Sequence, residues 1–117
     1  MIGITDIFKG GLEYSDYSFE TDNAIKEIKD VALKERFSLI FVIFPILSDG
    51  AQGESDWIVS KCQQYRIAYI DLREAFGKFG YEKIRISNDD YCHPNRTGNK
   101  LAAEEISQYL EKSFFKE

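Results

Sequence analysis

The chain has 117 residues, of which 44% are hydrophobic and 30% charged, and its formal net charge is −5 at pH 7. This length suits one domain with a real core. The acidic balance argues against nucleic acid or an anionic membrane surface as a partner, because either needs a basic face. No apolar run approaches the roughly 20 residues of a membrane span. There is no secretory signal pattern, and two cysteines do not make a disulfide framework, so the expected compartment is the cytoplasm.

The first half of the chain predicts a loop, a helix and a strand. The first twenty residues are rich in Gly and Tyr without periodicity and are expected to be mostly loop. From about Thr21, apolar residues recur at three- and four-residue spacing, which predicts a helix with Thr21 or Asp22 as its cap. The continuous apolar run 37–44, ended by Pro45, predicts a strand that is buried on both faces.

The second half alternates helix and strand in the same way. Ser55 is expected to cap a helix that continues to Tyr65. The apolar run 67–70 predicts a second strand. The remaining predicted elements are a short helix at 72–79 ended by Gly80, a polar stretch at 87–96 and a closing helix capped by Thr97.

Helices that alternate with buried strands are typical of a parallel α/β sheet with right-handed crossovers. Residues 1–117 are therefore expected to form a single α/β domain. Two strands, or three if Met1–Thr5 is also one, are fewer than such a sheet normally contains. An apolar edge strand that stays unpaired favours association. We therefore expect either a homo-oligomer that pairs its exposed sheet edges, or the later part of a larger domain.

The stretch from Asp90 to Gly98 is the part of the chain that suggests chemistry, and it contains the one histidine of the sequence, His93. The carboxylate of Asp90, three residues earlier, can hold one imidazole nitrogen, which leaves the other free to take a proton from a nucleophile. The two residues are therefore the candidate catalytic base and its orienting acid. The alternative is a surface histidine beside a helix start, because Pro94 and Thr97 both suit a first turn.

Residues 90–98, Asp-Tyr-Cys-His-Pro-Asn-Arg-Thr-Gly, resemble the last motif of the SGNH, or GDSL-type, hydrolases, which is D-x-x-H continued as P-N-x-x-G. Those proteins are serine esterases, lipases and acyl-hydrolases on a flavodoxin-like α/β/α three-layer parallel sheet. Residues 41–45 and 70–72 resemble its fourth and fifth strands, and the resemblance covers residues 22–112. No cofactor and no metal are expected. The site residues that the resemblance implies are the catalytic His93 and Asp90, and the motif-supporting Pro94, Asn95 and Gly98.

Other motifs of that family are missing. The sequence contains no Gly-Asp-Ser, the block that carries the nucleophilic serine. The family's G-x-N-D motif supplies an oxyanion-hole Asn. Gly3-Ile4-Thr5-Asp6 resembles this motif with Thr5 in place of the Asn, so Thr5 is the oxyanion-hole candidate. We therefore expect a truncated chain that begins near the third motif, lacks the first strands and the nucleophile, and is inactive alone.

Several other residues invite a chemical role and are better explained structurally. Cys92 could replace the missing serine, but adjacent side chains on a loop usually diverge, so attack assisted by His93 is not expected. Asp89, Asp90 and His93 could bind a divalent ion, but no second histidine or cysteine pair completes a ligand set. The triplet 48–50 follows a strand and is expected to be a turn. The residues expected in the core are Cys62, Phe37, Phe41, Phe44, Trp57, Phe76 and Phe79.

Two functions remain open. The first is an SGNH-like hydrolase that cleaves acyl or acetyl esters by a Ser-His-Asp mechanism, acting on a small-molecule ester once an upstream segment supplies the serine. The second is a non-catalytic α/β interaction or assembly module that dimerises through its exposed sheet edge.

Overall fold

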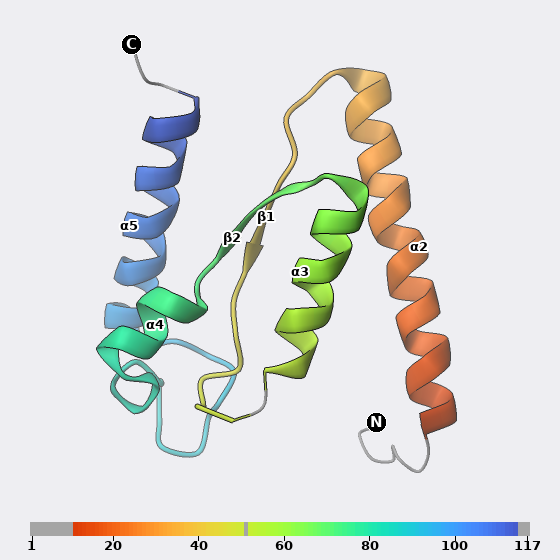
Figure 1. Ribbon diagram of the computed structural model, residues 1–117. Helices are drawn as coiled ribbons and strands as arrows, with labels where there is room; N and C mark the ends of the chain where they lie inside the picture. Colours follow the sequence, from red (N-terminus) through yellow and green to blue (C-terminus); the bar gives the residue numbers. More distant parts are fainter. Residues whose placement is uncertain (1–10, 51, 115–117) are drawn as a thin grey trace. The chain divides into compact units, whose positions relative to one another are not determined.

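A computed structural model describes residues 11–50 and 52–114 and divides the chain into two compact units, residues 1–39 and 40–117 (Figure 1). The single domain expected over residues 1–117 stays a prediction. None of the described helices is long and apolar enough to cross a membrane.

The helix α2, Gly11–Glu35, makes up most of the described part of the first unit. The predicted helix is confirmed, but it begins earlier than expected. Residues 11–20 were predicted as loop and are helical, and Thr21 and Asp22 lie inside the helix rather than at its cap. After its first residue the helix contains neither Gly nor Pro, and extending a helix costs much less than starting one, so nothing stops it at Thr21. It ends at Arg36, which takes a left-handed φ of 61°.

The second unit is mixed α/β, and its described residues contain a parallel sheet of two strands. β1, Ile40–Ile43, pairs with β2, Ala68–Asp71, in a register that places Ile40 beside Ala68 and Ile43 beside Asp71. The helix α3, Gly53–Tyr65, connects them, as a parallel pair requires. The elements that follow are α4, Arg73–Phe79, the 3-10 helix η1, Tyr81–Lys83, and α5, Arg96–Ser113.

Both predicted strands are confirmed, but the prediction that they are buried on both faces is wrong. In β1 only Ile43 is buried and its other residues are half-buried, and Ala68 of β2 is exposed. Figure 1 shows α3 and α5 on opposite sides of the two strands. A sheet this narrow is covered only in part by one helix on each side. The strand considered at Met1–Thr5 lies outside the described residues.

Two helices begin differently from the prediction. α3 starts after Gln52, whose Nε2 donates to two carbonyls of the preceding loop, at 2.9 and 2.7 Å. The predicted cap, Ser55, is buried inside the first turn. α5 is capped by Asn95 and not by Thr97. The Asn95 side chain both donates and accepts, which a hydroxyl at Thr97 cannot match, whereas the Gln52 side chain binds the preceding loop and makes no cap hydrogen bond to α3.

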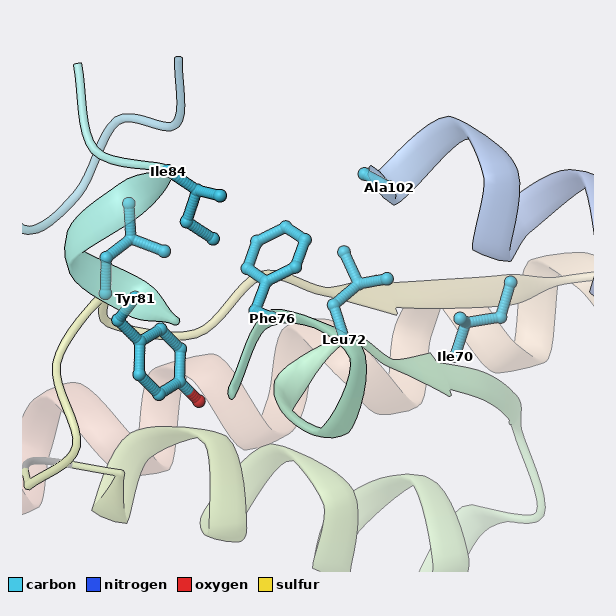
Figure 2. Close-up of a cluster of buried hydrophobic side chains, with 7 residues drawn as sticks. Ile70, Leu72, Phe76, Tyr81, Ile84 and Ala102 are labelled. Atoms are coloured by element: carbon cyan, nitrogen blue, oxygen red, sulfur yellow. The ribbon is translucent and has the colours of Figure 1, made fainter. Parts of the chain in front are cut away.

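The core of the second unit joins the sheet to α4, η1 and α5 (Figure 2). Phe76 is fully buried, lies between Leu72 and Ile84, and meets the ring of Phe44 edge-on with 6.1 Å between the centroids. Cys62 is buried as predicted. The buried side chains of the cluster are Leu47, Ile70, Leu72, Phe76, Tyr81, Ile84 and Ala102.

The aromatic residues predicted in the core divide into three groups. Phe76 is buried, Phe41 and Trp57 are half-buried, and Phe44 and Phe79 are exposed over 49% and 43% of their surface. Phe37 is exposed as well. The prediction failed for most of them because two strands offer too little inner face to cover every aromatic ring in an apolar run.

Phe76→Ala is expected to lower the free energy of unfolding by about 3–5 kcal/mol, because the truncation leaves a cavity in a closed cluster. Phe79→Ala is the matched control. It removes the same atoms from the same helix, but from a side chain that is 43% exposed, and should cost about 1 kcal/mol or less. Urea unfolding followed by circular dichroism measures both. Equal losses in the two variants would contradict this assignment of the core.

Candidate functional site

The loop 87–93 holds the candidate site. The imidazole Nδ1 of His93 lies 2.8 and 3.0 Å from the two carboxylate oxygens of Asp90. The structure therefore brings together the two residues that the sequence singled out as base and orienting acid. This contact occupies Nδ1 and fixes the orientation of the imidazole ring. Nε2 is then the nitrogen that can exchange a proton with another group.

Backbone amides hold the Asp90 carboxylate in place. Its Oδ1 accepts hydrogen bonds from the amides of Cys92, at 2.9 Å, and His93, at 3.0 Å, the arrangement of an Asx turn. The amide of Cys92 and the ring of His93 hold the pKa of Asp90 below its ordinary value, because both bind the ionised form. The side chain of His93 is 73% exposed, so water screens the attraction between the two side chains. The geometry of the pair therefore depends mainly on the amides.

A short antiparallel bridge between Arg85 and Pro94 closes the base of this loop. Positions on such a bridge alternate between those that exchange backbone hydrogen bonds and those that do not. Pro94 occupies a position where no N–H is needed, so a proline fits without loss of a bond. The flanking backbone hydrogen bonds run from the Ile86 amide to the His93 carbonyl, at 3.0 Å, and from the Asn95 amide to the Ile84 carbonyl, at 2.7 Å.

Asn95 ties the base of the loop to the start of α5. Its Nδ2 donates to the carbonyls of Lys83, at 3.1 Å, and Arg85, at 3.0 Å. Its Oδ1 accepts from the amide of Gly98, at 3.0 Å, which satisfies one of the unpaired donors at the helix start. A threonine hydroxyl has too few hydrogen-bonding atoms for these three contacts, and Thr97 lies exposed in the first turn. Asn95 therefore supports the loop structurally.

Gly98 allows the first turn of α5 to lie directly against the bridge. A Cβ atom at this position would lie 2.7 Å from Cβ of Pro94 and 3.2 Å from both Cβ and the carbonyl oxygen of Ile84. The contact with Pro94 is closer than real Cβ atoms come and the two with Ile84 are unusually tight, so a larger residue would push the helix away from the loop. The spacing P-N-x-x-G is therefore explained here by a cap and a close packing contact.

The loop is fastened to the carboxyl end of β1. The amide of Leu47, in the connection between β1 and α3, donates to the carbonyl of Tyr91 at 2.8 Å. Nε of Arg85 donates to the carbonyl of Leu47, also at 2.8 Å, and the guanidinium carbon lies 4.3 Å from the centroid of the Tyr91 ring. Ligands of open parallel sheets bind at the carboxyl ends of the strands. The pair of Asp90 and His93 is attached to that edge.

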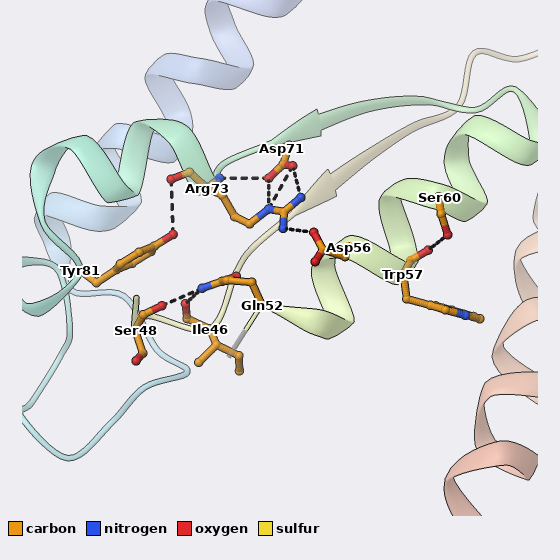
Figure 3. A network of polar contacts seen from close by, with 9 residues as sticks. All are labelled: Ile46, Ser48, Gln52, Asp56, Trp57, Ser60, Asp71, Arg73 and Tyr81. Atoms are coloured by element: carbon orange, nitrogen blue, oxygen red, sulfur yellow. Dashed lines mark hydrogen bonds and ion pairs between the residues drawn. The ribbon is translucent and has the colours of Figure 1, made fainter. Parts of the chain in front are cut away.

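A second polar cluster lies where β2 ends (Figure 3). The guanidinium of Arg73 binds both carboxylate oxygens of Asp71, with contacts of 2.7 to 3.1 Å, and also binds Asp56 in the first turn of α3. Partial burial raises the pKa of Asp71, but the hydrogen bonds and the charge of Arg73 outweigh it and hold that pKa below its ordinary value. The same carboxylates raise the pKa of Arg73. This cluster joins α3 to β2. Its positive and negative groups are paired with one another, so the arrangement does not call for a ligand.

The remaining candidates are not brought to the pair by any described contact. Thr5, the oxyanion-hole candidate, lies outside the described residues. The thiol-bearing residue Cys92 is exposed and contributes its amide to Asp90, and residues 48–50 form bends, in line with the predicted turn. Burial raises the pKa of the Cys62 thiol. Within residues 11–50 and 52–114, no three His, Cys, Asp or Glu side chains are grouped so that they could hold a metal ion.

Arg85 and Leu47 also contact the loop, and the sequence did not point to them, whereas Tyr91 lies in the stretch that it singled out but was given no role. Arg85 stands in Lys83-Ile84-Arg85-Ile86, an alternation of polar and apolar residues that is too short to predict a strand. Its partner Leu47 lies 38 positions away in the sequence, so only the fold places the two together.

Comparisons with protein-family models, with curated proteins and with solved structures find no match to this chain. The resemblance to SGNH hydrolases therefore rests on the residues quoted above. The geometry of the loop is a separate observation, because it follows from the contacts of Asp90, His93 and Asn95.

Gly98→Ala is expected to lower the free energy of unfolding by about 1–3 kcal/mol, because the added methyl group overpacks Pro94 and Ile84. Gly77→Ala is the control. Its Cβ would meet only ordinary contacts of 3.8 Å or more with Tyr81, and alanine in a helix is favoured over glycine by about 1 kcal/mol. Urea unfolding is expected to show opposite signs for the two substitutions. A neutral Gly98→Ala would contradict the close contact.

The titration of the Asp90 carboxyl carbon, followed by NMR, is expected to have its midpoint below about 3.9, the ordinary value for Asp. A lowered folded-state pKa stabilises the fold above the unfolded-state pKa, and that contribution is lost as the pH falls through the folded-state pKa. The stabilisation by Asp90 should therefore be complete at neutral pH, begin to fall below about pH 4 and be gone once the pH is below the folded-state pKa. In His93→Ala the midpoint should rise but stay below the ordinary value, because the Cys92 amide remains. A midpoint at or above the ordinary value would contradict the amide contacts.

Proposed function

We propose that this chain supplies the histidine and the aspartate of a Ser-His-Asp relay in an SGNH-like ester hydrolase. The observation that carries the proposal is the pairing of His93 Nδ1 with the Asp90 carboxylate at 2.8 Å, with Nε2 left for a nucleophile. The pair stands in the sequence Asp-x-x-His-Pro-Asn-x-x-Gly, and the contacts of Asn95 and Gly98 give that spacing a physical reason.

The chemistry follows from the two ring nitrogens. A serine hydroxyl attacks the ester carbonyl while its proton moves to Nε2 of His93, and the Asp90 carboxylate stabilises the imidazolium. His93 then gives that proton to the departing alcohol, which leaves an acyl-serine. Water attacks the acyl-serine in the same manner, with His93 as base, and releases the acid and the serine. The serine belongs to a Gly-Asp-Ser block on a segment upstream of this sequence, and residues 1–117 alone are inactive.

The fold proposed for the complete enzyme is the flavodoxin-like three-layer sheet, with β1 and β2 as two of its parallel strands. The position of the loop at the carboxyl end of β1 supports this, because that edge is where such sheets bind their ligands. Helices on both sides of the strand pair are also what that fold requires.

The substrates proposed are small acyl or acetyl esters. A pocket of about 140 Å³ opens at the same edge, between the end of β1 and the first turns of α3. This is smaller than the ≈ 300–1,000 Å³ of sites for drug-sized ligands, so it suits a small acyl group. Its lining residues are Ile43, Phe44, Ile46, Glu54, Ser55 and Ile58.

A second candidate function is a non-catalytic module that assembles through its sheet edge. The observation that favours it is the two-stranded sheet of the described residues, which is narrower than independent α/β sheets usually are. If the protein translated from the full reading frame forms a dimer and hydrolyses no ester, that result would favour this function.

The first test reads the DNA upstream of the codon for Met1. A Gly-Asp-Ser block in frame, or one frameshift away, is the expected result. An upstream region that encodes no such block would contradict the proposal.

The second test uses the protein translated from that whole reading frame. A fluorophosphonate probe is expected to label its Gly-Asp-Ser serine, whereas residues 1–117 alone stay unlabelled. Asp90→Asn should lower kcat for p-nitrophenyl acetate by about 10⁴-fold, because the imidazole is then held in the wrong tautomer, and His93→Ala should abolish serine-dependent turnover. Asp89→Asn, a neighbouring exposed acid outside the pair, is the control and should leave kcat unchanged. Turnover that does not depend on His93 would contradict its assignment as the catalytic base.

A further inference from the structure

The loop that carries Asp90 and His93 needs support from outside itself. His93 is 73% exposed and its neighbours Tyr91 and Cys92 are exposed as well, so few apolar contacts hold the loop. Segments of this kind open easily unless other contacts restrain them. The bridge between Arg85 and Pro94 restrains the base of the loop, but it does not reach Asp90 on the far side.

Arg85 supplies restraints at three places. Its carbonyl accepts from Asn95 Nδ2 at 3.0 Å, at the base of the loop. Its Nε donates to the carbonyl of Leu47 at 2.8 Å, in the connection between β1 and α3. Its guanidinium lies over the ring of Tyr91, 4.3 Å from the centroid, a distance at which a cation attracts an aromatic face. One side chain therefore links the loop to the end of the first strand.

The contact with Tyr91 matters because Tyr91 is the residue next to Asp90. The carbonyl of Tyr91 also accepts from the Leu47 amide at 2.8 Å, so Leu47 is bonded to the loop through its amide and to Arg85 through its carbonyl. These contacts form a closed ring of Arg85, Leu47 and Tyr91. The ring fixes the backbone on which the Asp90 carboxylate stands.

We propose that Arg85 is a positioning residue of the site, which holds Asp90 against Nδ1 of His93 by clamping Tyr91 to Leu47. The role of the pair in ester hydrolysis rests on the proposed function, but the clamp itself does not. A lysine would not replace Arg85, because it lacks the planar fork that bonds a carbonyl with one nitrogen while the guanidinium plane stacks on a ring.

The test measures the tautomer of His93 by NMR of the ring nitrogens, at a pH where the ring is neutral. His93 is the one histidine of the sequence, so its ring signals need no assignment. In the wild type the proton is expected on Nδ1, facing Asp90. Asp90→Asn gives the reference for a ring without its carboxylate. Arg85→Ala should move the ratio of Nδ1-protonated to Nε2-protonated ring toward that reference by at least about twofold, because it removes both the contact with the Tyr91 ring and the hydrogen bond to Leu47. Arg85→Lys should recover only part of it.

Two further variants separate positioning from general loosening. Tyr91→Leu removes the ring from an exposed position, where the fold tolerates change, and should shift the His93 ratio in the same direction as Arg85→Ala. Arg73→Ala removes an arginine of the same unit whose described contacts are with Asp71, Asp56 and Tyr81, and should leave the ratio unchanged while lowering stability.

An unchanged ratio in both Arg85→Ala and Tyr91→Leu would overturn the proposal, as would an equal shift in Arg73→Ala. Because this readout needs neither serine nor substrate, a shift in the ratio without any Gly-Asp-Ser upstream would retain the clamp and reject the hydrolase. If the complete enzyme is an active hydrolase but the His93 ratio does not change in Arg85→Ala, the proposed function would stand and the clamp would be rejected.

Discussion

The first turn of α5 lies so close to Ile84 and Pro94 that only a glycine fits at position 98. Ile84 is fully buried, and its carbonyl accepts from the Asn95 amide, so it joins the apolar core to the base of the loop. Asn95 then caps the helix through Gly98. Core, loop and helix therefore share one contact region. A displacement of α5 would disturb the cap, the bridge and the orientation of His93 together, because closely packed interiors transmit strain.

The pair of Asp90 and His93 shows how an exposed site can be ordered without burial. An ion pair on a surface contributes little, because water screens the charges and the side chains lose rotamer freedom. Here the carboxylate is held by two backbone amides of its own turn, and the contacts of Arg85 with Tyr91 and Leu47 restrain that turn from outside. The imidazole then binds a carboxylate that is already oriented. Arg73 combines the two kinds of contact: Asp71 lies only two residues away, whereas Asp56 comes from α3, so that half of the cluster depends on the tertiary fold.

The parts of the fold that the sequence predicted are those with a local signal. The apolar runs before Pro45 and Asp71 predicted both strands, and the spacing of Asp90 and His93 predicted their contact, because three residues within one turn cannot lie far apart. Where competing local signals exist, the prediction failed: Thr97 suits a cap, but Asn95 has more hydrogen-bonding atoms and takes that position. The clamp of Arg85 on Leu47 had no local signal at all, since it joins segments that only the fold brings together.

The bridge between Arg85 and Pro94 also bears on the order in which the chain folds. It closes a loop of few residues, and the entropy lost on closing such a loop is small. The parallel pairing of β1 with β2 spans a whole crossover helix, and non-local contacts of this kind form slowly. The bridge can therefore close before the two strands pair, and the contacts of the loop with Leu47 form only once the end of β1 is in place.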